Sequence, residues 1–263
     1  MRVIICKDRE TATALATQEI LRELTRKPDL LLGLATGSTP LGVYKKLVQA
    51  SREGTVDFSR VRTCNLDEYV GLPDDHPQSY RRFMRENLFD PLGLPEERTL
   101  FPPTEGPGLE AQCEAFESRL EELGGIDVQL LGLGSNGHIG FNEPTSSLAS
   151  RTRLKTLTEK TMADNSRFYS QGEKQPDLAS TMGIGTILSA RCIIIQAFGT
   201  YKAKAVQAAI EGPVMSLWPA SALQLHPKVV FYMDEDAAEL LTMRAYYRQV
   251  RENEEDVQKR RSL

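Results

Sequence analysis

Short apolar runs alternate with amphipathic segments along most of the chain. The runs have strand length, and each predicts a buried strand. They are Val3–Cys6, Leu30–Leu34, Val61–Leu66, Val128–Leu133, Cys192–Phe198 and Val229–Met233. Between them, apolar residues recur at three-to-four spacing, as in the segment after Asp8 and in a late segment from about Ala237 to Glu252, which predicts helices.

The order strand, loop, helix predicts an α/β fold. We expect a mostly parallel sheet with helices on both faces, in the Rossmann-like doubly wound arrangement. No repeat or linker divides the 263 residues, so we expect one domain, residues 1–263, with a C-terminal helical tail from about residue 237. Ligands of such sheets bind at the carboxyl ends of the strands. Polar residues that follow different strands can therefore meet in one site.

A glycine-containing loop, Thr36-Gly37-Ser38-Thr39, follows the second predicted strand. Thr39 suits a helix N-cap and Pro40 suits the first helical position. A phosphate above this helix would gain backbone N–H groups and the helix dipole. The loop is not a Walker A motif, because no Gly-Lys-Ser/Thr follows, and the alternative is an ordinary capped turn.

The segment from Gly132 to Gly137 has the GxGxxG spacing of dinucleotide-binding loops. That fingerprint needs a helix that opens at its third glycine. Here the chain continues through His138 to Glu143 and Pro144, which is poor helix material. No acidic residue stands about twenty positions downstream, so we expect no nicotinamide cofactor.

The same segment contains better candidates for acid–base chemistry. His138 lies between glycines, with Asn136 and Glu143 close in sequence, and a carboxylate near an imidazole raises its pKa. Asp67 follows a predicted strand and can act as a general base, since an ordinary aspartate is ionised at neutral pH. The alternatives are a structural loop histidine and a helix-capping aspartate.

Two cations, Arg167 and Lys202, could provide charge for a phosphate, or could be solvated surface residues. His76 and His226 each precede a proline and are interpreted as turn residues.

Composition narrows the class of protein. The chain is 40% hydrophobic and 26% charged with a net charge of −4, so a nucleic-acid partner is not expected. Its four cysteines form no CxxC pair and no zinc pattern, which favours reduced thiols and no metal. No secretory segment or membrane-spanning run is visible, and we expect a cytoplasmic protein.

Several blocks of sequence resemble the signature blocks of the glucosamine-6-phosphate deaminase (glucosamine/galactosamine-6-phosphate isomerase) family. The longest are Leu34–Pro40, Asn65–Leu72 and Gly137–Pro144; Ala163–Phe168, Gly183–Leu188 and Ser221–His226 agree as well. The resemblance covers essentially the whole chain. It implies a cofactor-free enzyme that converts glucosamine 6-phosphate to fructose 6-phosphate and ammonia in amino-sugar catabolism.

The resemblance also implies roles. Asp67 would take the C2 proton, and His138, supported by Glu143 and Asn136, would open the sugar ring. The loop Thr36–Thr39, Arg167 and Lys202 would hold the phosphate. Some family members carry aspartate where this chain has Asn136, which would leave Glu143 as the only anion beside His138. The alternatives are a 6-phosphogluconolactonase, another sugar-phosphate isomerase, or a non-catalytic sugar-phosphate sensor.

Some family members are hexamers that N-acetylglucosamine 6-phosphate activates at a second site. The positions that resemble that site are Ser146, Arg153, Lys155 and Tyr247. On an extended segment Arg153 and Lys155 would point to the same side. The alternative for these two cations is a basic strand edge that discourages aggregation.

Overall fold

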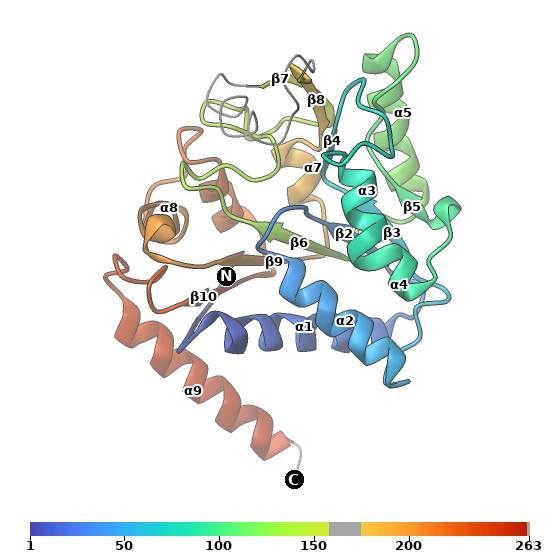
Figure 1. Cartoon of the computed structure of the whole chain (residues 1–263). Coiled ribbons are helices and arrows are strands. Elements are labelled where there is room, and N and C mark those ends of the chain that lie inside the picture. The colour runs from blue at the N-terminus through green and yellow to red at the C-terminus, as the bar shows by residue number, and fades with distance from the viewer. Residues whose placement is uncertain (158–174, 262–263) are drawn as a thin grey trace.

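A seven-stranded parallel sheet forms the centre of the structure, a computed structural model that describes residues 1–157 and 175–261 (Figure 1). The strand order is β1-β10-β9-β6-β2-β3-β5, and all six neighbouring pairs are parallel. The bounds are β1 (Arg2–Cys6), β2 (Leu31–Leu34), β3 (Arg62–Asn65), β5 (Thr99–Leu100), β6 (Val128–Gly132), β9 (Cys192–Ala197) and β10 (Val229–Asp234). The predicted parallel sheet is confirmed.

Helices cover both faces of this sheet, as the sequence predicted. The helices are α1 (Arg9–Arg26), α2 (Leu41–Arg52), α3 (Tyr80–Met84), α4 (Asp90–Leu92), α5 (Leu109–Glu122), α7 (Ile184–Leu188), α8 (Ala203–Ile210) and α9 (Arg244–Arg261). A π-helical turn (Arg85–Phe89) joins α3 to α4, and short 3₁₀ turns lie at Glu96–Arg98, Thr200–Lys202 and Pro219–Leu225. One apolar core packs α1 and α2 on one face, and a second packs α5, α7 and α8 on the other. The two cores fit the continuous apolar character of strands buried on both sides.

A second, three-stranded antiparallel sheet lies beside the carboxyl ends of the large one. Its order is β4 (Asp67–Tyr69), β8 (Leu178–Thr181), β7 (Arg153–Thr156). The sequence predicted one strand through residue 66 with Asp67 at its end, and this detail is wrong. Leu66 is the crossing point: its N–H bonds to the Leu34 carbonyl at 3.1 Å, and its carbonyl accepts the Met182 N–H at 2.7 Å. Asp67 therefore begins a strand of another sheet.

Two predicted helix starts also differ from the structure. Pro40, not Thr39, occupies the cap position of α2, with helical backbone angles and no side-chain capping bond. The predicted C-terminal helix begins at Arg244 instead of Ala237, because Asp234 holds a turn by accepting the N–H groups of Ala237 and Gly199. Helix α9 then extends away from the body of the molecule, in red in Figure 1.

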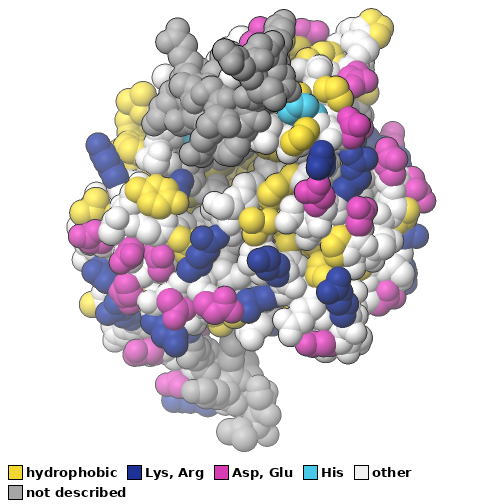
Figure 2. Space-filling view, viewed as in Figure 1, with side chains coloured by type: hydrophobic (Ala, Val, Ile, Leu, Met, Phe, Trp, Pro, Cys, Tyr) yellow, Lys and Arg dark blue, Asp and Glu magenta, His cyan; other side chains and the backbone are white. Residues whose placement is uncertain are grey.

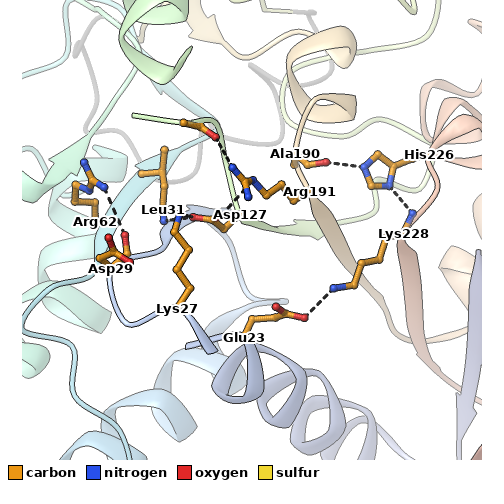
Figure 3. A network of polar contacts seen from close by, with 11 residues as sticks. Glu23, Lys27, Asp29, Leu31, Arg62, Asp127, Ala190, Arg191, His226 and Lys228 are labelled. Carbon is orange, nitrogen blue, oxygen red and sulfur yellow. Dashed lines mark hydrogen bonds and ion pairs between the residues drawn. The ribbon is translucent and has the colours of Figure 1, made fainter. Parts of the chain in front are cut away.

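A polar network joins the amino ends of several strands of the large sheet (Figure 3). Asp127, just before β6, accepts the Leu31 N–H at 2.9 Å and pairs with Lys27 at 2.6 Å. His226 is buried and bonds through Nε2 to the Ala190 carbonyl at 2.7 Å, which confirms it as a turn residue with a structural role. These contacts tie the amino ends of the strands together, away from the clusters predicted to be functional.

The molecular surface in the view of Figure 2 carries lysine and arginine interspersed with aspartate and glutamate. This mixture agrees with the small net charge of −4. In the two described ranges, every helix is too short or too polar to cross a bilayer.

Candidate active site

One cavity of about 280 Å³ opens at the carboxyl ends of the parallel strands. Its walls come from segments that follow four different strands of the large sheet, including β4 and the start of α3. It is lined by Ala35–Thr39 after β2, Leu66, Asp67, Tyr69 and Tyr80 beyond β3, Gly132–Gly134, His138, Gly140, Phe141 and Glu143 after β6, and Lys202 after β9. The predicted convergence of distant polar clusters is therefore confirmed. The cavity has the site class expected for an open α/β sheet.

Asp67 lies at the floor of the cavity and is only 6% exposed. Burial, followed by the negative charge of Glu68, raises its pKa to about 8, against the lowering effect of a hydrogen bond from the Phe141 backbone N–H. The expectation of an aspartate fully ionised at neutral pH is therefore wrong for the free site. The sequence could not show this, because burial and the neighbouring charge decide the pKa.

Gly140 explains how the chain passes so close to this carboxyl group. It has a φ of +56°, and a Cβ built there would lie 3.1 Å from Asp67 Oδ2 and 3.2 Å from Thr181 Oγ1. Thr181 Oγ1 in turn accepts the Phe141 N–H at 3.2 Å. Glycine thus lets the segment after His138 cover Asp67 and exclude solvent from it.

An aromatic wall, which the sequence did not predict, stands beside Asp67. Tyr69, Tyr80 and Phe141 have ring centroids 4.9 to 6.1 Å apart, and Tyr80 and Phe141 are stacked. Tyr80 also makes a side-chain hydrogen bond with Thr36 in the loop after β2, and burial raises its pKa well above the usual value. The wall provides an apolar surface for a ligand and keeps the Tyr80 hydroxyl neutral.

The loop Thr36–Thr39 lines the mouth of the cavity ahead of helix α2. Gly37 has a φ of +94°, in the region that favours glycine, and produces the tight turn. The Thr39 side chain lies over Gly132, 3.7 Å from the position of a Cβ there. Lys202 faces the same cavity, and burial lowers its pKa. A phosphate would restore the favoured charge state of this amine, since an anion nearby stabilises the cation.

His138 and Glu143 also line the cavity. The imidazole Nδ1 lies 3.2 Å from Glu143 Oε1, at ion-pair distance. A Cβ at Gly134 would fall 2.4 Å from that ring, so only glycine leaves room for it. The glycines around His138 do serve close backbone approach, as predicted.

Asn136 supports this pair indirectly. Its Nδ2 donates to Glu143 Oε2 at 2.6 Å, and its Oδ1 accepts the His138 backbone N–H at 3.2 Å. The sequence suggests a contact with the imidazole ring; the bonds in the structure go to the carboxylate and the backbone instead. Asn136 therefore orients Glu143 and adds no negative charge.

The GxGxxG segment does not have the geometry of a dinucleotide loop. Residues 133–152 contain turns and an isolated bridge between Ile139 and Asn142, and no helix opens at Gly137. Gly137 has a φ of +84°, and a Cβ there would meet the Trp218 ring at 2.7 Å. The expectation that no helix opens at the third glycine is confirmed.

The other predicted residues lie elsewhere. Arg167 is outside the described residues. Arg153 and Lys155 lie two apart on β7, so the expected extended segment is confirmed, and Ser146 is buried in a turn after Glu143. Tyr247, on α9, donates to Glu211 Oε1 at 3.2 Å. None of the last four lines the cavity described above.

The family model described as glucosamine-6-phosphate isomerases/6-phosphogluconolactonase matches residues 8–232. The chain belongs to this family.

Within the family, the chain is similar in sequence to proteins named as deaminases. A glucosamine-6-phosphate deaminase of Hahella chejuensis is 53% identical over 95% of each chain, and one of Cellvibrio japonicus is 49% identical over 97% of each. A solved monomeric glucosamine-6-phosphate deaminase superposes with a TM-score of 0.86 at 41% identity, covering 91% of this chain and all of that one. A 6-phosphogluconolactonase of Trypanosoma brucei has a TM-score of 0.73 at 22% identity, covering 92% of this chain and 98% of its own, which shows a shared fold only.

Proposed function

We propose that this family member is a glucosamine-6-phosphate deaminase, which isomerises glucosamine 6-phosphate and releases fructose 6-phosphate and ammonia. The observation that carries the proposal is that one cavity is lined by Asp67, by the His138–Glu143 pair and by the loop Thr36–Thr39. The chain is identical to proteins named as deaminases at about half of its positions, over nearly its whole length, and this supports the proposal.

The phosphate fits the end of the cavity formed by the loop Thr36–Thr39 and Lys202. Backbone N–H groups ahead of α2 and the half-buried amine of Lys202 are suited to a dianion. Binding energy from this remote group holds the sugar in place over the reacting groups. Arg167, which the family resemblance places in the same clamp, stays a prediction.

Ring opening requires a proton to move from O1 to O5 of the closed sugar. His138 is the group in the cavity suited to this transfer, since imidazole exchanges protons near neutral pH. Glu143 at 3.2 Å stabilises the protonated ring, and Asn136 holds Glu143 in place.

Asp67 then takes the proton from C2, and the open-chain sugar becomes an enolamine. A proton delivered to C1 gives the imine at C2, to which water adds, and ammonia leaves. A pKa of about 8 makes Asp67 a stronger base than an ordinary aspartate, but leaves roughly one-tenth of it ionised at pH 7 in the free site. The rate constant should therefore rise as the pH approaches 8.

A direct assay tests the proposal. The purified chain is incubated with glucosamine 6-phosphate, and both ammonia and fructose 6-phosphate are measured; hydrolysis of 6-phosphogluconolactone is measured in parallel. Equal amounts of the two products support the deaminase. Lactone hydrolysis without ammonia would overturn it in favour of the lactonase, and saturable binding without turnover in favour of a sensor.

We further propose an activator site for N-acetylglucosamine 6-phosphate at Ser146, Arg153, Lys155 and Tyr247, in a homo-oligomer such as a hexamer. Support comes from the family resemblance and from the two cations two apart on β7, where burial lowers the pKa of Arg153. The alternative is a basic strand edge. Substrate-saturation curves with and without the activator, beside a light-scattering mass, test this; an activator-independent hyperbola from a 29.4 kDa species would reject it.

We propose a cytoplasmic location and a single domain that spans the chain. All four cysteines are buried free thiols, which supports a reducing compartment. Mass spectrometry of the protein isolated from cell fractions tests the first, and a single cooperative unfolding transition tests the second.

A further inference from the structure

A second carboxylate lies directly behind the proposed base and outside the cavity. Glu68 is 1% exposed and does not line the cavity, whereas its strand neighbours Asp67 and Tyr69 do. Successive side chains of a strand point to opposite sides, so Glu68 faces away from the ligand space. A buried carboxylate is costly unless its oxygens are hydrogen-bonded, and its partners should show why it stands there.

The partners of Glu68 are backbone groups of its own strand and of helix α3. Oε1 accepts the N–H of Tyr69 at 2.8 Å and of Tyr80 at 3.1 Å, and Oε2 accepts the N–H of Arg81 at 2.8 Å. The next N–H along, that of Arg82, bonds to the Ser79 hydroxyl at 3.0 Å. Glu68 therefore fastens the first turn of α3 to β4.

This attachment determines where the aromatic wall of the cavity stands. Tyr80 is the first residue of α3, and its ring stacks on Phe141 and lies 4.9 Å from the Tyr69 ring. If the bonds to Glu68 were lost, the first turn of α3 would be free to move, and Tyr80 with it.

We infer that Glu68 is a positioning residue that holds the aromatic wall in place through α3 and keeps a fixed negative charge at the back of Asp67. The inference rests on the proposed role of Asp67 as the base, and it adds a residue that never touches the substrate.

The hydrogen bonds decide which of the two adjacent carboxyl groups keeps its proton. Burial raises the pKa of both, but Glu68 receives three backbone N–H groups and faces the Arg81 guanidinium, all of which favour its ionised form. Asp67 receives one backbone N–H, from Phe141. The ionised form is therefore better stabilised at Glu68 than at Asp67, and the charge of Glu68 contributes to the raised pKa of Asp67.

Other titratable groups near Asp67 stay the same when Glu68 is changed. Tyr69 shares its strand, Tyr80 faces it from α3, and His138, Glu143 and Lys202 line the same cavity. Arg81 faces Glu68 from α3. All of these groups are present in every Glu68 variant, whereas the charge at position 68 is absent only from Glu68→Gln.

The test compares pH profiles of kcat/KM for the wild type, Glu68→Gln, Glu68→Asp and a matched control, Glu117→Gln. Glu117 is also a buried carboxylate with a backbone donor, the Thr152 N–H at 2.7 Å, but lies outside the cavity. In Glu68→Gln the limb of the pH profile that reports ionisation of Asp67 should shift to lower pH by roughly one unit, because one nearby negative charge is lost. The plateau of kcat should fall roughly threefold, because a weaker base transfers the proton more slowly.

The two other variants separate charge from stability. Glu117→Gln should lower the melting temperature and leave the limb unmoved. Glu68→Asp reaches the three N–H groups poorly, so KM should rise because the aromatic wall is no longer held in place. A limb unmoved in Glu68→Gln, or an unchanged KM in Glu68→Asp, would overturn the inference. If Glu68→Gln melts below the assay temperature, sucrose is added to favour the folded state.

A readout independent of activity keeps this test separate from the proposed function. If the wild type releases no ammonia, the proposed function fails, and unfolding free energies at pH 8 are compared for Asp67→Asn, Glu68→Gln and the double variant. Repulsion between the two carboxylates predicts that the double change stabilises by less than the sum of the single effects. Strict additivity would show that the charges do not interact, and would also overturn the inference.

Discussion

Replacing Asp67 by asparagine should stabilise the protein while it removes turnover. Asparagine has nearly the same shape, and its side-chain oxygen can still accept the Phe141 N–H that Asp67 accepts now. The substitution removes a buried ionisable group, since Asp67 is 6% exposed. When a residue is needed for catalysis but lowers stability, its replacement is expected both to stabilise the fold and to remove activity.

The size of the effect follows from the difference in pKa between the folded and unfolded chain. Burial raises the pKa of Asp67 from 3.8 to about 8, so the unfolded chain loses this proton at lower pH than the folded chain. Below pH 3.8 the group is protonated in both states and costs nothing; the cost grows as the pH rises toward 8 and is constant above it. At pH 7 the cost is on the order of 4 kcal/mol, because each tenfold difference in proton affinity corresponds to about 1.36 kcal/mol.

Part of this gain is lost in the variant, because the buried asparagine amide lacks the water it had when unfolded, at a cost of about 1–3 kcal/mol. We therefore expect Asp67→Asn to be more stable than the wild type by roughly 1–3 kcal/mol at pH 7, and no more stable than it at pH 4. For a chain of this size the gain corresponds to a melting temperature higher by roughly 2–10 °C.

The assay is thermal unfolding of both proteins in steps from pH 4 to pH 9, with ammonia release measured on the same samples. Asp75→Asn, at an exposed position, is the matched control and should leave the pH dependence of stability unchanged. A pH-independent difference between Asp67→Asn and the wild type would refute the reasoning, because the linkage requires it to grow between pH 4 and 8. Near-normal turnover in the folded variant would refute the role of Asp67 as the base.

Three further changes probe the rest of the cavity. Gly134→Ala should lower kcat at least tenfold with little loss of stability, because the new Cβ would lie 2.4 Å from the His138 ring and displace it. An unchanged kcat would show that the position of the ring does not matter. Asn136→Asp places a second carboxylate where the amide now lies 2.6 Å from Glu143, so one of the two should bind a proton near neutral pH and alter the pH profile of ring opening; an identical profile for closed-ring substrate would contradict this. Lys202→Met should raise KM for the sugar phosphate and weaken inhibition by inorganic phosphate, with kcat largely kept; a KM equal to the wild-type value would remove Lys202 from the phosphate site.

Much of the architecture was determined by local pattern alone. Each of the six predicted strands is a strand of the large sheet. For all but β3, whose residues are Arg-Thr-Cys-Asn, the reason is that strands buried on both faces need mostly apolar sequence. The order of strands and helices then placed the loop after β2, Asp67 and His138 at the same edge, since the carboxyl ends of parallel strands share an edge. Blocks of sequence identified the family, and with it the candidate roles.

The tertiary structure decided what depends on partners distant in sequence. The second sheet could not be predicted, because Leu66 changes sheets through bonds to Leu34 and Met182 that no local pattern encodes. The pKa of Asp67 depends on burial under Gly140 and on the charge of Glu68, and the aromatic wall depends on how α3 is attached to β4. Residue type and spacing fix which chemical groups are available, whereas burial, charge and hydrogen bonds between distant segments fix their protonation and position.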